Sequence, residues 1–177
     1  MTTLLRIRNT EDPALTELMP IYAEAFPPSE RRSEKQLKRL IKENDSMYFN
    51  LVLFEGKIAG LFVYWNLADF FFLEHLAISP DMRNHKIGQQ VLDWIADNLN
   101  GIRLMEVEPS GSSEFASRRI AYYERNGYKI LNKNYQQPSY SNKNISYPMR
   151  IMGNQEVAEL NSYIDKIIIK VYTKYYA

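Results

Sequence analysis

Hydrophobic positions recur along the chain with two different periods, and the change of period separates expected helices from expected strands. Apolar residues three and four positions apart predict helices over Pro13–Phe26, Ser33–Ile41, Ile87–Leu99, Ser113–Arg125 and Asn154–Tyr172. Runs of β-type residues predict strands over Leu4–Ile7, Tyr48–Phe54, Ile58–Trp65, Asp69–Ile78, Ile102–Val107, Tyr128–Leu131 and Ile145–Ile151. The polar stretch 132–144, which lies between the last two strands, is predicted to be a loop.

Short polar motifs mark where several of these elements begin. Asp12, which stands before a proline, is the expected N-cap of the first helix. Ser33 and Gln36 have the spacing of a capping box for the second. Gly56 between two strands predicts a hairpin turn, and Asn154 is the expected cap of the long last helix.

The order of elements predicts the fold class. A strand and two helices precede a three-strand meander, which is followed by helix, strand, helix and strand. The strands on either side of the helix near Gly88 are expected to be parallel neighbours because a helical crossover joins them. The prediction is an α/β fold with a mixed, mostly antiparallel sheet, a splayed parallel pair and helices on both faces. Residues 1–177 are expected to form one domain, with a core at about 3–152 and an extra C-terminal helix at about 154–172.

Composition and charge exclude several classes of function. The 177 residues are 45% apolar and 24% charged, which is typical of a globular protein. The net charge is only +1, and the densest basic run, Arg31–Arg39, is mixed with acids, so a solvated helix face is expected and no nucleic-acid partner. No apolar stretch is long enough to cross a membrane, and the N-terminus does not resemble a signal peptide. The absence of cysteine excludes thiolate metal sites and is compatible with the cytoplasm, and two histidines make a histidine metal site unexpected.

The stretch LAISPDMRNHKIG, residues 76–88, carries the pattern that points most strongly to chemistry. An apolar strand stops at a proline, passes Arg83 and reaches Gly88 where a helix begins. The first N–H groups of a helix lack partners within the helix, and the helix dipole favours an anion there. A turn that directs several N–H groups into one concavity binds phosphate, and glycine lets a diphosphate approach the backbone. An exposed polar turn is the alternative interpretation.

With the strand that follows it and the later stretch RRIAYYERNGYKI, this pattern resembles the GNAT superfamily of N-acetyltransferases. The first GNAT signature is an apolar strand, a proline and then Arg/Gln-x-x-Gly-x-Gly/Ala at a helix start. Arg83 and Gly88 match its first and last positions, while Lys86 stands where glycine is usual. The resemblance is strong over roughly Leu51–Ile130 and implies a GNAT-like fold.

The second GNAT signature is a helix with a tyrosine four residues before a glycine and an aromatic residue. Tyr123, Gly127 and Tyr128 match it. Either signature alone is weak, but the two in order with a strand between them are a fairly specific sign of the family.

The resemblance implies that acetyl-CoA is the cosubstrate and that no metal is needed. The main chain at the helix start would bind the diphosphate, and backbone groups of the preceding strand would pair with the pantetheine amides as an added strand does. Lys86 is expected to have ordinary helical dihedrals and to add a charge near the phosphates. The cofactor-binding residues implied are Leu76, Ala77, Ile78, Arg83, Asn84, His85, Lys86, Ile87, Gly88, Gln89 and Tyr123.

Acetyl transfer to an amine needs a base for the ammonium and an acid for the leaving thiolate. Tyr123 matches the family tyrosine that serves as general acid, and a packing role is the alternative. Glu74 and Glu106 are equal candidates for the base: Glu74 matches a strand position where some relatives carry a base, and Glu106 matches a glutamate of enzymes that acetylate ribosomal-protein N-termini. A salt bridge to Arg118 or Arg119 is the structural alternative for either carboxylate.

These features predict an N-acetyltransferase that moves the acetyl group directly to a primary amine of a small molecule or peptide, since no cysteine can carry an acyl-enzyme. The alternative is a non-catalytic acyl-CoA-binding sensor or interaction module; Lys86, and Ala116 where the family has asparagine, keep it open. Glu30, Tyr135 and Tyr140 are candidate acceptor contacts. The last helix packs either on its own domain or on a second subunit of a homodimer.

Overall fold

The computed structural model describes residues 1–173 and has the α/β fold that the sequence predicts. The strands are β1 (Thr2–Arg6), β2 (Met47–Phe54), β3 (Lys57–Asn66), β4 (Phe70–Ile78), β5 (Ile102–Val107), β6 (Lys129–Pro138) and β7 (Ser146–Gly153). The helices are α1 (Ala14–Ala25), α2 (Glu34–Glu43), α3 (Ile87–Asn98), α4 (Glu114–Arg125) and α5 (Leu160–Ile167), with short helices η1 (Pro28–Glu30), η2 (Pro80–Met82) and η3 (Ile168–Tyr172).

The strands hydrogen-bond in the order β1-β2-β3-β4-β5-β7-β6. β4 and β5 are parallel, as the helical crossover between them predicts, and their pairing joins Phe70–Leu73 to Ile102–Met105. β1 with β2, β2 with β3, β5 with β7 and β6 with β7 are antiparallel. The prediction of a mixed, mostly antiparallel sheet with one parallel pair is confirmed.

The chain divides into two compact units, each described by itself. The N-terminal unit comprises Met1–Asn66 and Glu74–Asn100, and the C-terminal unit comprises Leu67–Leu73 and the chain from Gly101 onward. β4 therefore begins in the C-terminal unit and ends in the N-terminal one. A single domain over the whole chain stays a prediction.

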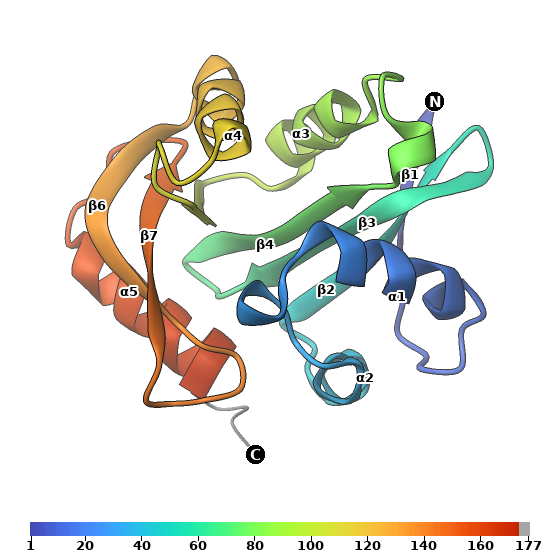
Figure 1. Cartoon of the computed structure of the whole chain (residues 1–177), viewed down its shortest axis with the longest axis horizontal. Coiled ribbons are helices and arrows are strands. Elements are labelled where there is room, and N and C mark those ends of the chain that lie inside the picture. Colours follow the sequence, from blue (N-terminus) through green and yellow to red (C-terminus); the bar gives the residue numbers. More distant parts are fainter. Residues whose placement is uncertain (174–177) are drawn as a thin grey trace. The chain divides into compact units, whose positions relative to one another are not determined.

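The N-terminal unit is built on β1, β2 and β3, with α1, α2 and α3 around them (Figure 1). Glu55 and Gly56 both have positive φ, 51° and 78°, so the predicted hairpin turn has the twist that antiparallel strands favour. β3 supplies the middle of the core, and Leu61 and Val63 are fully buried. The capping box of α2 is present: the Gln36 N–H donates to the Ser33 hydroxyl and the Ser33 N–H to the Gln36 side chain.

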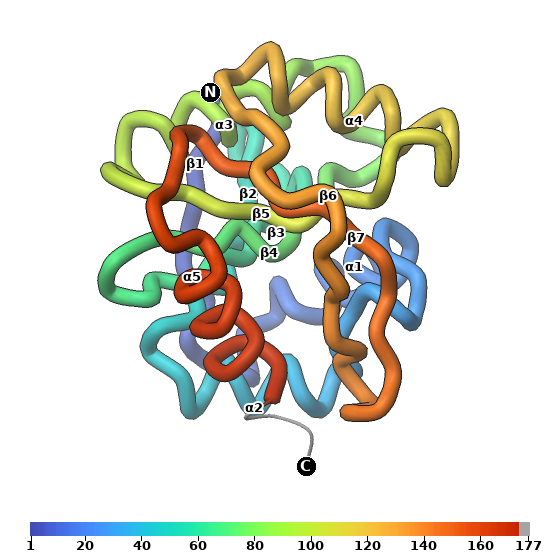
Figure 2. Tube along the Cα trace, turned by 90° about the vertical axis from the view of Figure 1, so that its left-hand side faces the viewer, coloured from blue at the N-terminus to red at the C-terminus, as the bar shows by residue number. Residues whose placement is uncertain are grey.

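The C-terminal unit contains β5, β7 and β6 with α4, α5 and η3. Figure 2 shows β6 and β7 running side by side along their length, as their pairing requires. Apolar side chains from β5, β7, α4, α5 and η3, together with two from the start of β4, form its core: Phe70, Phe72, Leu104, Val107, Ile120, Ile151, Met152, Ile167 and Val171.

Two sequence predictions in the C-terminal unit are wrong. β6 extends to Pro138, so residues 132–138 are strand and not loop; the strand is polar because it lies at the end of the sheet and pairs with β7 alone. Asn154 does not cap the last helix, which begins six residues later at Leu160. Its side chain accepts from the Arg103 N–H at 2.7 Å and donates to the Gly101 carbonyl at 3.0 Å, fixing the start of β5 instead.

Candidate active site

The segment between β4 and α3 has a backbone that differs from the predicted one. Lys86 is the N-cap of α3 and has left-handed dihedrals, φ 57° and ψ 22°, and Asn84 also has a positive φ of 68°. The expectation of ordinary helical dihedrals at Lys86 is therefore wrong. Lys86 adopts the conformation for which glycine is best suited, at a cost of about 1–2 kcal/mol for a residue with a Cβ.

This backbone fits an anion. The first hydrogen bond of α3 runs from the Gln90 N–H to the Lys86 carbonyl at 3.1 Å, so the N–H groups of Ile87 and Gly88 precede the helical ladder. Left-handed residues at nearby positions are the kind of backbone from which anion nests are made. Arg83 and Lys86 are exposed and bring positive charge to the same turn.

His85 and Gln89, two other predicted cofactor residues, have side-chain contacts within the N-terminal unit. The His85 Nδ1 lies 3.0 Å from the Arg83 carbonyl oxygen and 3.3 Å from that of Met82, so it is the protonated ring nitrogen. The Gln89 side chain donates to Asp93 at 2.9 Å. Their backbone, more than their side chains, is what a cofactor at this turn would contact.

In the last residues of β4, the backbone N–H and C=O groups of successive residues point alternately to the two edges of the strand. The Ala77 carbonyl faces β3, because an ideal Cβ on Gly60 would lie only 2.0 Å from its oxygen. The Ser79 N–H donates to β3 as well, at 2.8 Å. Backbone groups alternate between edges along a strand, so those of Leu76 and Ile78 face the other edge. Of the three predicted strand contacts, these two offer groups to an added strand, while Ala77 offers its carbonyl to β3.

The pairing of β4 supports an accessible edge. Its register with β5 ends at Leu73, although the strand continues to Ile78. Glu74 is part-exposed as a whole residue while its side chain is only 1% exposed, so its exposed surface belongs to the backbone. An extended ligand can therefore reach the main chain of β4 beyond Leu73.

The Glu74 side chain lies in a buried ionic network with Arg32 and Trp65. Arg32 Nη2 donates to one carboxylate oxygen at 2.9 Å, and Trp65 Nε1 donates to the other at 2.8 Å. The side chains of Arg32 and Glu74 are each 1% exposed. The prediction of a solvated helix face is wrong for Arg32, which precedes α2 and points into the interior. A carboxylate with both oxygens engaged by buried donors serves primarily to hold these elements together.

His75 belongs to the same unit and is held neutral by its surroundings. Its Nε2 donates to the Glu30 carbonyl at 2.8 Å, and its Nδ1 lies 3.5 Å from the Tyr22 hydroxyl. Burial lowers the pKa of His75, against a smaller opposing effect of the Glu74 charge. His75 thus fastens η1 to β4.

The backbone of Tyr123 takes part in the cap at the C-terminal end of α4, and this explains the spacing of the second signature. The Tyr128 N–H donates to the Tyr123 carbonyl and the Gly127 N–H to that of Glu124, each at 3.1 Å. Gly127 has φ 83°, so the three residues form a Schellman motif, and the Tyr123 and Tyr128 rings meet with centroids 6.1 Å apart. The spacing therefore has a structural cause that does not involve the Tyr123 hydroxyl.

The electrostatics of Tyr123 favour the protonated form. Desolvation raises the pKa of Tyr123, and the positive charge of Arg119 lowers it by a smaller amount. A phenol with a raised pKa stays protonated through neutral pH and can donate a proton.

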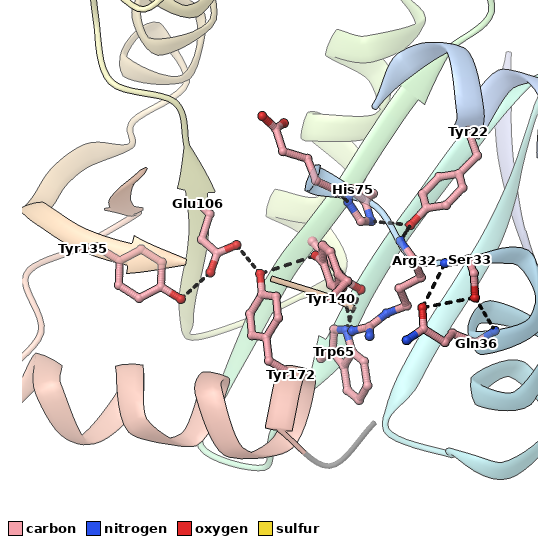
Figure 3. A network of polar contacts seen from close by, with 12 residues as sticks. Tyr22, Arg32, Ser33, Gln36, Trp65, His75, Glu106, Tyr135, Tyr140 and Tyr172 are labelled. Atoms are coloured by element: carbon pink, nitrogen blue, oxygen red, sulfur yellow. Dashed lines mark hydrogen bonds and ion pairs between the residues drawn. The ribbon is translucent and has the colours of Figure 1, made fainter. Parts of the chain in front are cut away.

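Glu106 lies on β5 in the C-terminal unit, where two tyrosines bind its carboxylate (Figure 3). The Tyr135 hydroxyl donates to Oε1 at 2.6 Å and the Tyr172 hydroxyl to Oε2 at 2.5 Å. Tyr135 and Tyr140, predicted acceptor contacts, are each only 4% exposed and belong to this cluster. Neither arginine suggested as a partner has a role here: Arg118 pairs with Glu114 and Arg119 with Glu108.

The predicted residues thus divide between the two units. Those of the N-terminal unit are the β4 edge, the Arg83–Gln89 turn and Glu74, and those of the C-terminal unit are Glu106 and Tyr123. Sequence reasoning missed Arg32 and Tyr172. For Tyr172 the available signal was its position at the end of a strongly apolar helix.

Residues of α1 and of the chain around the start of α2 line a cavity within the N-terminal unit. It has a volume of about 620 Å³ and lies between the start of α1 and the start of α2, with Glu11, Tyr22, Arg31 and Lys38 in its wall. Within residues 1–173, no cluster of His, Asp or Glu is arranged to hold a metal ion. Over the same range, every helix is too short or too polar to cross a membrane.

Part of the chain matches a known protein family. Residues 45–130 match the family described as "Acetyltransferase (GNAT) domain", and this range contains both signatures. The predicted resemblance to the GNAT family is confirmed over these residues. The prediction of an acyltransferase is confirmed at the level of the family. No curated protein matches the sequence.

Solved structures share the fold over nearly the whole chain. A putative GNAT-family acetyltransferase from Bacteroides thetaiotaomicron is 27% identical, with a TM-score of 0.86 over 96% of this chain and 98% of that one. The ribosomal-protein-S18-alanine N-acetyltransferase from Escherichia coli is 22% identical, with a TM-score of 0.59 over 90% and 97%. A GNAT-family acetyltransferase from Elizabethkingia anophelis with acetyl-CoA bound is 16% identical, with a TM-score of 0.57 over 88% and 98%. The last two similarities concern the fold alone.

Proposed function

We propose that this protein transfers the acetyl group of acetyl-CoA directly to a primary amine. The observation that carries the proposal is the turn before α3, where left-handed backbone at Asn84 and Lys86 accompanies the N–H groups of Ile87 and Gly88. A similar fold has been solved with acetyl-CoA bound, which supports this choice of cosubstrate.

Two parts of the N-terminal unit bind the cosubstrate in this proposal: the turn before α3 and the outer edge of β4. The N–H groups of Ile87 and Gly88 donate to the diphosphate, and the charges of Arg83 and Lys86 attract it. The backbone groups of Leu76 and Ile78 on the outer edge of β4 pair with the pantetheine amides. The cosubstrate supplies an activated acyl group on sulfur.

Glu106 and Tyr123 carry out the proton transfers in this proposal. Glu106 removes a proton from the acceptor ammonium, and the freed nitrogen forms a bond to the acetyl carbon while the carbon–sulfur bond breaks. Tyr123 gives its proton to the departing thiolate. The nitrogen still carries two protons after it has bonded to the acetyl carbon, and it releases one of them to solvent as the amide forms. The proton held by Glu106 then replaces that of Tyr123 through solvent. Glu74 is not given this role because Arg32 and Trp65 engage its carboxylate.

The acceptor is proposed to be a small-molecule amine or the N-terminal amine of a peptide. The ribosomal-protein-S18-alanine N-acetyltransferase from Escherichia coli has a similar fold, which supports the peptide class without selecting it. The proposed location is the cytoplasm, and assembly as a homodimer through the last helix remains an alternative to packing within one chain.

Release of CoA from acetyl-CoA, measured with a panel of small amines and short peptides, tests the proposal. Turnover that depends on one class of acceptor is the expected result. The left-handed lysine in a position suited to glycine favours a second candidate, a binding module without turnover. That candidate predicts an increase in melting temperature with CoA but no CoA release with any acceptor, and no thermal shift at all would contradict both.

A further inference from the structure

The hydroxyl of Tyr172 reaches a carboxylate that lies 66 positions earlier in the sequence. It donates to Glu106, and the Tyr140 hydroxyl lies 3.4 Å from the Tyr172 hydroxyl. Because the Tyr172 proton is directed at Glu106, Tyr140 is the donor within the tyrosine pair. Figure 3 shows this chain of hydroxyls ending on the carboxylate, with Tyr135 on its other oxygen.

A change of helix type brings Tyr172 to this position. After α5 the helix becomes a π-helix, in which the Thr173 N–H donates to the Ile168 carbonyl five residues back, and the Thr173 hydroxyl donates to the same oxygen at 2.9 Å. In an α-helix, a residue five positions after Ile167 would lie about 140° around the axis. The wider π-turn reduces this angle, so that Tyr172 lies closer to the face of the helix that Ile167 occupies. Val171 and Tyr172 are both buried, at 0% and 1% exposure.

We propose that Tyr172, placed by this π-turn, positions the carboxylate of Glu106 to accept a proton from the acceptor amine. Tyr172 is a positioning residue, since it acts through Glu106. The segment after β7 is then a working part of the active site. The inference rests on the proposed function, in which Glu106 is the base.

The chemistry of the contacts favours this role. Hydrogen bonds of 2.5 and 2.6 Å from hydroxyls to a carboxylate are the short, charge-assisted kind, and they fix the side chain in one orientation. Donors to a carboxylate favour its ionised form, which is the form that can accept a proton.

The test uses the whole chain and variants that each remove one hydroxyl. Tyr172→Phe removes the Oε2 donor and Tyr135→Phe the Oε1 donor. Tyr163→Phe is the matched control on α5, because the Tyr163 ring packs against Phe70. Carbon-13 NMR of labelled glutamate side chains follows the ionisation of Glu106, assigned by loss of its signal in Glu106→Gln.

The midpoint of the Glu106 titration is expected to rise by about one pH unit in Tyr172→Phe, since one such hydrogen bond is worth about 1.4 kcal/mol. Tyr135→Phe is expected to shift it in the same direction, and Tyr163→Phe is expected to leave it unchanged. In activity assays, Tyr172→Phe is expected to lower kcat about tenfold, with the acidic limb of the pH profile moved upward and the KM for acetyl-CoA unchanged.

An unchanged titration in folded Tyr172→Phe overturns the inference, even if Glu106→Gln is inactive. Full activity of Glu106→Gln overturns the assignment of the base in the proposed function, and with it the catalytic part of the inference, even if the titration shifts. The NMR titration needs no turnover, so the two failures are distinguishable.

Discussion

Glu74 and Glu106 are both glutamates on the central strands, and the hydrogen-bond donors described for the two carboxylates differ in charge. A guanidinium and an indole N–H bind Glu74, and its side chain is 1% exposed. Two tyrosine hydroxyls bind Glu106, which is part-exposed. A buried cation neutralises a carboxylate and makes protonation costly, whereas hydroxyl donors orient it without cancelling its charge. From the sequence alone the two residues are equal candidates for the general base. Their hydrogen-bond partners favour a structural role for Glu74 and the catalytic role for Glu106.

This difference shows why a carboxylate in an apolar strand is an ambiguous signal. Burying a charge is expensive, so such a residue has either a partner that balances it or a function that requires it. Only the three-dimensional position of Arg32, outside α2 and 2% exposed, indicates which case applies to Glu74.

Replacing Arg32 is expected to damage the fold. Arg32→Met leaves the buried Glu74 carboxylate without its cation, and breaking a buried pair in this way costs about 3–5 kcal/mol. Chemical denaturation measures the free energy of unfolding. Arg118→Met is the control, because its pair with Glu114 has side chains that are 71% and 72% exposed and contributes about 0–1 kcal/mol. Equal stability of the two variants would show that the Arg32–Glu74 pair is not structural.

Removing the Tyr123 hydroxyl is expected to reduce kcat about 100-fold, the lower range for loss of a general acid. Tyr123→Phe keeps the ring that packs on Tyr128 and the carbonyl that closes the Schellman motif, so stability is expected to be nearly unchanged. The measurement is turnover with a good acceptor beside a melting curve. Tyr122→Phe is the neighbouring control. Wild-type kcat in folded Tyr123→Phe would leave this tyrosine with a packing role alone.

His75 gives the smallest effect, a pH dependence of stability. Its pKa in the folded protein is lowered by burial, so below the ordinary histidine pKa of about 6.5 the unfolded chain binds a proton that the folded chain does not. The contribution of His75 is therefore present above pH 6.5 and is lost as pH falls, by at most about 1.4 kcal/mol per pH unit.

Unfolding measured from pH 7.5 to pH 5 tests this dependence. His75→Gln is expected to be less stable than the wild type at pH 7.5, with a shallower decline toward pH 5. His85→Gln is the control, because His85 is exposed. Parallel pH curves for wild type and His75→Gln would contradict the account of a neutral, buried His75.

Much of the fold could be predicted because local chemistry decides it. The capping box at Ser33, the turn at Gly56 and the strand Ile102–Val107 follow from short-range preferences that the tertiary structure respects. The part of β6 after residue 131 could not be predicted, because its polar residues reflect its place at the end of the sheet, which depends on pairing with β7. The start of α5 was missed because the Asn154 side chain bonds to residues around β5, more than 50 positions away.

The candidate site could be predicted where a motif is continuous in sequence. The Arg83–Gln89 turn and Tyr123 belong to such motifs, although the left-handed backbone at Lys86 was not foreseen, since lysine has no preference for it. The partners of Glu74 and Glu106 come from distant segments, and no local pattern links Arg32 or Tyr172 to them. Contacts of this kind follow from the fold and cannot be derived from spacing along the chain.

The most direct measurement of the central claim is the pH dependence of kcat/KM for amine acetylation by wild type and Glu106→Gln. The account predicts an acidic limb in the wild type that is absent from Glu106→Gln, with kcat/KM at least about 100-fold lower and CoA binding retained. An acidic limb that persists in Glu106→Gln at wild-type rates would contradict this prediction and would show that another group is the general base.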